Sequence, residues 1–184
     1  IDYDGANYRG WQTQQEGVPS VQLTVEQALS QIANHPIGVH AAGRTDAGVH
    51  ASGMIVHFDT DAIRGHRNWL LGANRLLPND IAVRWIHPVS DDFHARFKAV
   101  ARRYRFVIFN SPLRSSMLAG KVTWHYHHLD VERMKLAAQY LVGVHDFTSF
   151  RAVGCQARNP VRDVHFLNVS QLGSLIVLDI QADG

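Results

Sequence analysis

Residues 101–109, ARRYRFVIF, are the stretch at which the order of the predicted elements begins again. Charged and aromatic side chains alternate over residues 103–106, and apolar residues follow to 109, which predicts a β-strand. Tyr104 and Phe106 fall on one face of this strand, and Arg103 and Arg105 fall on the other. A helix and two further strands are predicted after it, and the same order occurs in the first half of the chain. The sequence therefore predicts an α+β fold of two lobes, each an antiparallel sheet with helices on one face.

The predicted helices are marked by capping residues and by apolar side chains at helical spacing. Ser20 is placed to cap a helix that Pro36 closes, and Asp130 is placed to cap another that Gly143 ends. A further helix carries the apolar side chains between residues 69 and 77. The other predicted strands are residues 37–42, 54–58, 81–86, 161–170 and 175–181, and residues 110–128 are interpreted as irregular.

The expected domains are an N-terminal lobe, residues 1–92, and a C-terminal lobe, residues 93–184. The second lobe as written has three strands and one helix, so it lacks the last helix and strand of the repeated pattern. The chain begins at Ile1 rather than at a methionine and stops at Gly184 just after an apolar run. We therefore expect a fragment that is truncated at both ends, with an incomplete second lobe.

The composition predicts a soluble, globular protein: 46% of the 184 residues are hydrophobic and 18% are charged. No stretch approaches the roughly 20 apolar residues that a membrane span needs, and no signal peptide is visible. The single cysteine, Cys155, excludes a disulfide within the chain. A reducing compartment is the default for such a chain, so we expect it in the cytoplasm.

The charges are distributed unevenly between the two halves. Residues 1–92 carry six Lys and Arg against ten Asp and Glu, whereas residues 93–184 carry twelve against six. If a phosphate backbone is bound, the second half is where we expect it, and phenylalanines interleaved with its basic residues suit RNA. The basic residues of this expected track include Arg96, Lys98, Arg102, Arg103, Arg105, Arg151, Arg158 and Arg162.

Residues 43–50, GRTDAGVH, carry the clearest chemical signal. Two glycines bracket Arg44 and Asp46, so the backbone can turn sharply and direct both side chains into a cleft. An arginine so close to a carboxylate favours the ionised form and can also bind a phosphate. The alternative is an Asx-turn, in which the Asp46 carboxylate only bonds local backbone amides.

Several motifs in one order resemble the TruA family of tRNA pseudouridine synthases. They are GRTDAGVH with the helix before it and VHFDT after it, then DDFHARF, ARRYR, HDFTSFRA and CQAR. The similarity runs from about Tyr3 to about Ala182. It implies two ferredoxin-like lobes with an active-site cleft between them, a homodimer, and conversion of uridine to pseudouridine at positions 38, 39 and 40 of the tRNA anticodon arm. No metal and no cofactor are implied.

The resemblance also implies roles for individual residues. Asp46 would be the catalytic nucleophile or base, and the residue chemistry leaves both possibilities open. Arg44 and Arg64 would contact tRNA and help extrude the target nucleotide, and Tyr104 would stack on its base. The implied RNA-binding residues are Phe93, His94, Ala95, Arg96, Phe97, Gly154, Cys155, Gln156, Ala157 and Arg158.

Other functions suggested by the residues are weaker. His125 and His127 would share a strand face and could begin a metal site, but no cysteine or carboxylate lies close in sequence to complete it. A non-catalytic RNA-binding module with the same fold is the main alternative, although such a module would be expected to have lost Asp46. A metal-dependent nuclease would have to use Asp2, Asp4, Asp91 and Asp92, which no common spacing links.

Overall fold

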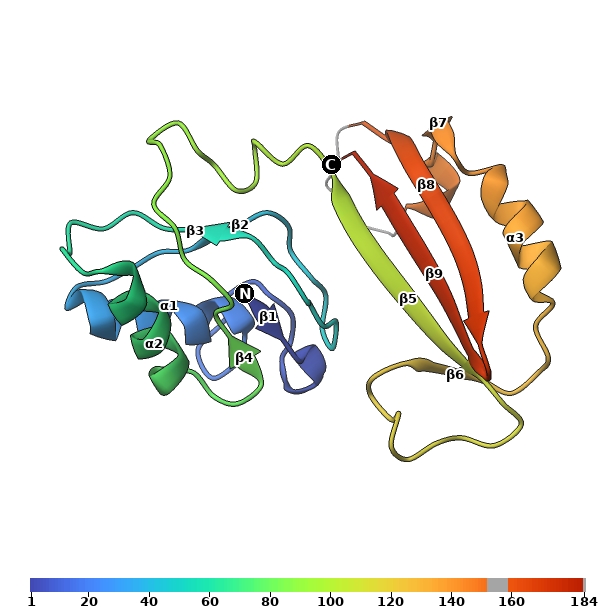
Figure 1. Cartoon of the computed structure of the whole chain (residues 1–184), viewed down its shortest axis with the longest axis horizontal. Coiled ribbons are helices and arrows are strands. Elements are labelled where there is room, and N and C mark those ends of the chain that lie inside the picture. Colours follow the sequence, from blue (N-terminus) through green and yellow to red (C-terminus); the bar gives the residue numbers. More distant parts are fainter. Residues whose placement is uncertain (152–158, 184) are drawn as a thin grey trace. The chain divides into compact units, whose positions relative to one another are not determined.

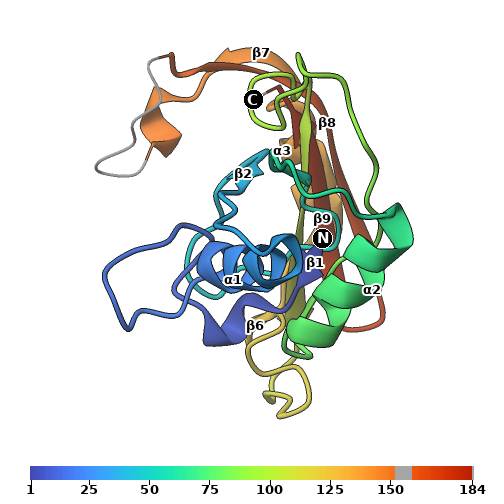
Figure 2. The ribbon, with the colours of Figure 1, turned by 90° about the vertical axis from the view of Figure 1, so that its left-hand side faces the viewer.

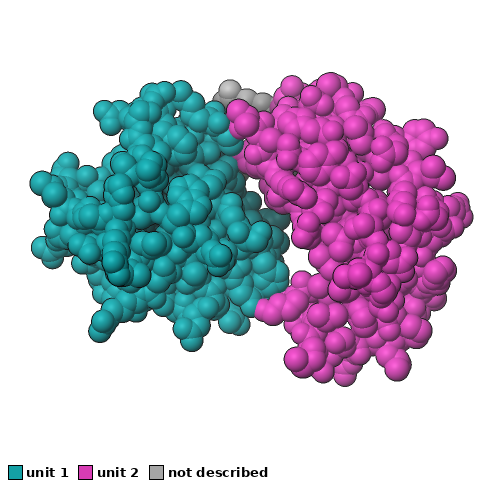
Figure 3. Space-filling view, in the orientation of Figure 1, with its two compact units in different colours: residues 1–99 teal, residues 100–184 magenta. Residues whose placement is uncertain are grey.

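A computed structural model of the chain describes residues 1–151 and 159–183. The chain divides into two compact units, Ile1–Ala99 and Val100–Gly184, which Figure 3 colours separately. Both units contain helices and strands, so the predicted α+β class is confirmed. Within the described residues, no helix has the length and apolar character that crossing a membrane would require.

In the first unit, the elements follow the order strand, helix, strand, strand, helix, strand (Figure 1). All strands of this unit are two residues long, and they pair antiparallel, β1 with β4 and β2 with β3. An isolated bridge also joins Tyr3 of β1 to Ala51. The elements are β1 (Asp2–Tyr3), the 3-10 helix η1 (Gly5–Asn7), α1 (Val21–Ala33), β2 (His40–Ala41), β3 (Val56–His57), α2 (His66–Leu76) and β4 (Ile81–Ala82).

The helix α1 begins where the sequence predicts it. The Ser20 hydroxyl accepts a hydrogen bond from the N–H of Leu23, and Asn34 ends the helix in the left-handed conformation with φ of 62°. Figure 2 shows α1 and α2 side by side, and Gly72 of α2 leaves room for the side chain of Ile32. The two helices bury one apolar core together with Trp11, which is only 2% exposed.

The second unit is built on one five-stranded sheet with the order β6-β5-β9-β8-β7. The helix α3 packs on one face of it along β8 (Figure 1), and Asp130 caps this helix by accepting from the N–H of Arg133. The elements are β5 (Arg102–Asn110), β6 (Thr123–His125), α3 (Val131–Gln139), β7 (Gly143–Asp146), the 3-10 helix η2 (Thr148–Phe150), β8 (Val161–Leu172) and β9 (Leu175–Ala182).

Two strands of this sheet were not predicted from the sequence. β6 lies inside residues 110–128, which were interpreted as irregular, and it pairs parallel to β5. The prediction of purely antiparallel sheets is therefore wrong, because this sheet is mixed. β7 pairs with β8 and begins at Gly143, whose φ of 99° suits glycine. Both strands have four residues or fewer, too few to show alternation, so only pairing with a distant strand defines them.

The face of the sheet that carries α3 is only partly covered. Ile176 lies in the core beneath the helix and is 0% exposed. Tyr104 pairs with Ile180 and Phe106 pairs with Leu178, so both aromatic side chains share this apolar face. They nevertheless remain 54% and 52% exposed. The predicted separation of aromatic and arginine faces along β5 is confirmed, and its aromatic face remains open to solvent.

Replacing Ile176 by alanine should lower the free energy of unfolding by about 2–5 kcal/mol, because a fully buried side chain leaves a cavity. Leu172→Ala is the matched control, since Leu172 is 78% exposed at the end of the neighbouring strand, and its cost should stay within about 0.5 kcal/mol. Urea unfolding followed by circular dichroism measures both. Equal costs for the two variants would contradict the described core.

Candidate functional site

The GRTDAGVH loop, residues 43–50, connects β2 to the segment that leads into β3. Arg44 and Asp46 are both exposed in this loop, where the sequence predicted that they would point into a cleft. Gly48 has a φ of 78°, a conformation that side-chain-bearing residues rarely adopt. The chain thus turns back sharply just after Asp46.

The backbone of this loop is held by the N-terminal segment, residues 3–11. The N–H of Trp11 donates to the carbonyl of Thr45 at 2.9 Å, and the N–H of Gly48 donates to the carbonyl of Tyr8 at 3.2 Å. These bonds lie on either side of Asp46 in the sequence. They fix the loop without involving the carboxylate.

Two glycines of the N-terminal segment allow this close approach. A β-carbon on Gly5 would lie 2.0 Å from the carbonyl oxygen of Val49, and one on Gly10 would lie 2.8 Å from that of Thr45. Gly10 also has a φ of 103°. The Tyr3 hydroxyl adds a hydrogen bond of 2.8 Å to the hydroxyl of Thr45. Only glycine fits at positions 5 and 10 without moving the loop.

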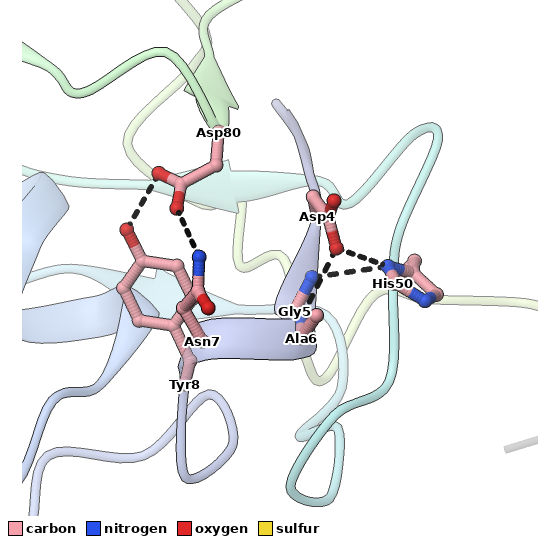
Figure 4. A network of polar contacts seen from close by, with 7 residues as sticks. All are labelled: Asp4, Gly5, Ala6, Asn7, Tyr8, His50 and Asp80. Atoms are coloured by element: carbon pink, nitrogen blue, oxygen red, sulfur yellow. Dashed lines mark hydrogen bonds and ion pairs between the residues drawn. The ribbon is translucent and has the colours of Figure 1, made fainter. Parts of the chain in front are cut away.

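Side-chain contacts join the far end of the loop to the same segment (Figure 4). Nδ1 of His50 lies 2.8 Å from the Asp4 carboxylate and 3.1 Å from the backbone nitrogen of Gly5. The same carboxylate accepts from the N–H of Ala6 at 3.1 Å. A single ring nitrogen either donates to the carboxylate or accepts from an amide, and either contact ties His50 to this segment.

A second group of contacts anchors the segment to the turn before β4 (Figure 4). The Tyr8 hydroxyl donates to the Asp80 carboxylate at 2.8 Å, and the N–H of Asp4 donates to the Asp80 carbonyl at 2.8 Å. The Asn7 amide lies 3.4 Å from the other carboxylate oxygen. Burial of Tyr8, followed by its hydrogen bond to Asp80, raises the pKa of the phenol to about 12. This phenol therefore stays a donor at neutral pH.

The Asp46 carboxylate accepts no hydrogen bond from any residue that the structure describes. Its carbonyl, rather than its side chain, accepts from the N–H of Val49 at 3.2 Å. The Asx-turn interpretation is therefore not supported within the described chain. Arg44 likewise forms no ion pair with a described carboxylate. An exposed carboxylate on a fixed backbone can act on a bound substrate as a nucleophile or as a base.

The other predicted site residues lie in both units. Arg64 is exposed just before α2 and donates to the carbonyl of Ile63 at 3.1 Å. Residues 93–97 belong to the first unit, and Tyr104 belongs to the second. Residues 154–158 fall outside the described residues.

Two of the aspartates considered for a metal-dependent nuclease lie close to basic side chains. Asp2 lies 3.4 Å from Arg84, and Asp92 lies 2.9 Å from Lys98. The rings of His125 and His127 are 6.0 Å apart, between centroids. Among residues 1–151 and 159–183, no group of three or more His, Cys, Asp or Glu is arranged to hold a metal ion.

A cluster of three histidines in the first unit was not predicted from the sequence. His40, His57 and His94 come from β2, β3 and the 93–97 segment, and their ring centroids lie 4.6–5.5 Å apart. Nothing local in the sequence indicates this cluster, because its members are separated by 17 and 37 residues. The three side chains meet only when the chain folds.

Comparison with known proteins gives one consistent family. The sequence model of the tRNA pseudouridine synthase family matches residues 1–98 and 137–184. The tRNA pseudouridine synthase A of Acinetobacter baylyi is 55% identical over 184 residues, which cover 100% of this chain and 68% of that protein. The enzyme of the same name from Pseudomonas aeruginosa is 55% identical over 183 residues, or 64% of its length.

Gly5→Ala and Gly10→Ala should each lower the free energy of unfolding by about 2 kcal/mol or more, because the new β-carbon collides with a backbone carbonyl of the loop. Gly53→Ala is the control, since a β-carbon there meets no atom within 4 Å. Its effect should stay within about 1 kcal/mol. Urea unfolding of the three variants measures this. If Gly5→Ala unfolds like Gly53→Ala, the loop is not fixed by close approach.

Proposed function

Because this chain belongs to the tRNA pseudouridine synthase family, we propose that it isomerises uridine to pseudouridine in tRNA with Asp46 as the reacting carboxylate. The Asp46 loop carries the proposal. Its carboxylate is exposed and has no described partner, while its backbone is held by the segment of residues 3–11. A reacting group needs this combination of a fixed position and a free lone pair.

The isomerisation balances without an external reagent. The bond from N1 of the uracil to C1′ of the ribose breaks, and a bond from C5 to C1′ forms. C5 loses its proton and N1 takes one up, so no electron is gained or lost. A carboxylate can open the first bond either by attacking C1′ or by removing a proton from the sugar. Asp46 has the chemistry for both routes.

The target nucleotide must leave the helical stack before Asp46 can reach its sugar, at a cost of a few kcal/mol. Arg44, on the same loop as Asp46, and Arg64, before α2, are the cations proposed to contact the tRNA at this step. Both are exposed, and neither forms an ion pair with a described carboxylate. Tyr104 is proposed to stack on the flipped base, since its ring is 54% exposed.

The proposed substrate is the anticodon arm of tRNA, with uridines 38, 39 and 40 as the targets. Residues 93–97 and 154–158 are proposed to bind the RNA together with the basic residues of the second half of the chain. The exposed pair Arg96 and Phe97 supports this, because arginine binds phosphate and phenylalanine stacks on a base. Two ferredoxin-like lobes, a homodimer and a cytoplasmic location complete the proposal.

Asp46→Asn should abolish pseudouridine formation and leave tRNA affinity within about threefold, because the amide keeps the shape but loses the reactive charge. Asp61→Asn, at an exposed carboxylate of the same unit, is the matched control and should keep normal turnover. Release of tritium from C5-labelled uridine in tRNA measures the reaction, and filter binding measures affinity. Appreciable turnover by the Asp46→Asn variant would exclude Asp46 as the reacting carboxylate.

Tyr104→Ala should lower turnover about tenfold or more while changing tRNA affinity little, since stacking is gained only after the base has flipped. Phe106→Ala is the control, because Phe106 lies on the same strand face and is 52% exposed. Single-turnover kinetics separate the two effects. A loss confined to affinity, or an equal loss in both variants, would exclude the stacking role.

A further inference from the structure

Three imidazoles join the 93–97 segment to the strands of the first unit. The ring of His57 lies 5.1 Å from that of His40 and 4.6 Å from that of His94, between centroids. His57 and His94 are half-buried, and Phe93 meets the edge of the His57 ring at 5.9 Å. The cluster is therefore the contact through which this segment packs against β2 and β3.

The hydrogen bonds of the cluster require unprotonated Nδ1 atoms. The N–H of Ala95 donates to Nδ1 of His57 at 3.2 Å. The N–H groups of Arg96 and Phe97 point at Nδ1 of His94, at 3.2 and 3.3 Å. A backbone amide can only donate, so a proton on either Nδ1 would turn each bond into a repulsive contact between two donors.

These bonds fix the direction of the segment. Ala95 is buried, with 4% of its surface exposed, whereas Phe97 is 76% exposed and Arg96 also faces solvent. The guanidinium of Arg96 lies over the Phe97 ring, 5.8 Å from its centroid. Burying the Ala95 side chain therefore turns a cation and an aromatic ring outward as one unit.

We propose that His57 and His94 are positioning residues, which hold Arg96 and Phe97 in place to bind a phosphate and an unstacked base of the tRNA. This inference rests on the proposed function, in which residues 93–97 bind the RNA. Neither histidine needs to touch the RNA. His57 acts through the backbone amide of Ala95, and His94 acts through the amides of Arg96 and Phe97 and through its ring, which lies 4.2 Å from that of Phe97 between centroids. Since an arginine beside an exposed ring suits a single-stranded stretch, the contact falls on unpaired nucleotides.

The surroundings of His57 favour its neutral form. Burial lowers the pKa of this imidazole below its ordinary value of 6.5, and positive charge on His94 or His40 lowers the pKa further. Asp59 and the His40 backbone act in the opposite direction. A pKa that is lower in the packed state means that packing is fully favourable above pH 6.5 and weakens as the pH falls below it.

The test uses two replacements of His57 and measures tRNA affinity between about pH 5.5 and pH 8. His57→Asn keeps an acceptor oxygen near the position of Nδ1 but cannot be protonated in this range. His57→Leu keeps bulk and removes the acceptor. His87→Asn is the control, because His87 meets His66 at 5.9 Å on an exposed part of the same unit.

At pH 8, His57→Leu should raise the Kd for tRNA and the KM about tenfold, with kcat within about twofold, whereas His57→Asn should bind like the wild type. As the pH falls to 5.5, the ratio of the wild-type Kd to the His57→Asn Kd should rise about threefold or more. The ratio cancels the general gain in affinity that protonating the other histidines produces. A constant ratio, or a loss of kcat at unchanged KM, overturns the proposal.

Hydrogen exchange in the free protein separates this inference from the proposed function. The amides of residues 95–97 should exchange faster in His57→Leu than in the wild type, and His57→Asn should restore their protection. Faster exchange with unchanged tRNA affinity would show that the cluster only packs the segment, and the proposal would fail while the proposed function stands. Absence of pseudouridine formation by the wild type would instead remove the proposed function.

Discussion

The approach of Gly5 and Gly10 to the loop of residues 43–50 is the constraint on which the site depends. The backbone carbonyls of Val49 and Thr45 occupy the space that β-carbons on these two glycines would need. β1, in the same segment, pairs with both Ala51 and β4, so one short segment ties the loop to the rest of the unit. The loop is thereby held by its backbone, and the carboxylate of Asp46 remains available.

The helices could be predicted from the sequence because their determinants are local. Ser20 and Asp130 cap α1 and α3 within three residues of the positions that they serve, and apolar side chains recur with the helical period. β6 and β7 could not be predicted in this way, since each is defined by pairing with a partner strand. The strands of the first unit have two residues each, so periodicity cannot give their bounds either.

The candidate site likewise contains residues that the sequence indicates and residues whose role only the folded chain shows. Arg44 and Asp46 stand out in the sequence because two glycines bracket them, and the structure places both in an exposed loop. The residues that hold the loop gave no comparable signal, since Gly5 and Gly10 resemble ordinary turn glycines. Their importance depends on carbonyl groups about 40 residues away, and only the folded chain reveals that distance.

The two proposed functional segments are held by different chemistry, which gives them different responses to pH. Most of the contacts that hold the Asp46 loop are backbone hydrogen bonds and glycine contacts, neither of which titrates. Its network also includes a phenol with a pKa raised to about 12, chiefly by burial, so this donor is unaffected near neutrality. The segment of Arg96 and Phe97 depends instead on the lone pairs of two imidazoles. Mild acid is therefore expected to act first on the proposed RNA-binding segment, while backbone hydrogen bonds and glycine contacts continue to hold the loop of the proposed reacting carboxylate.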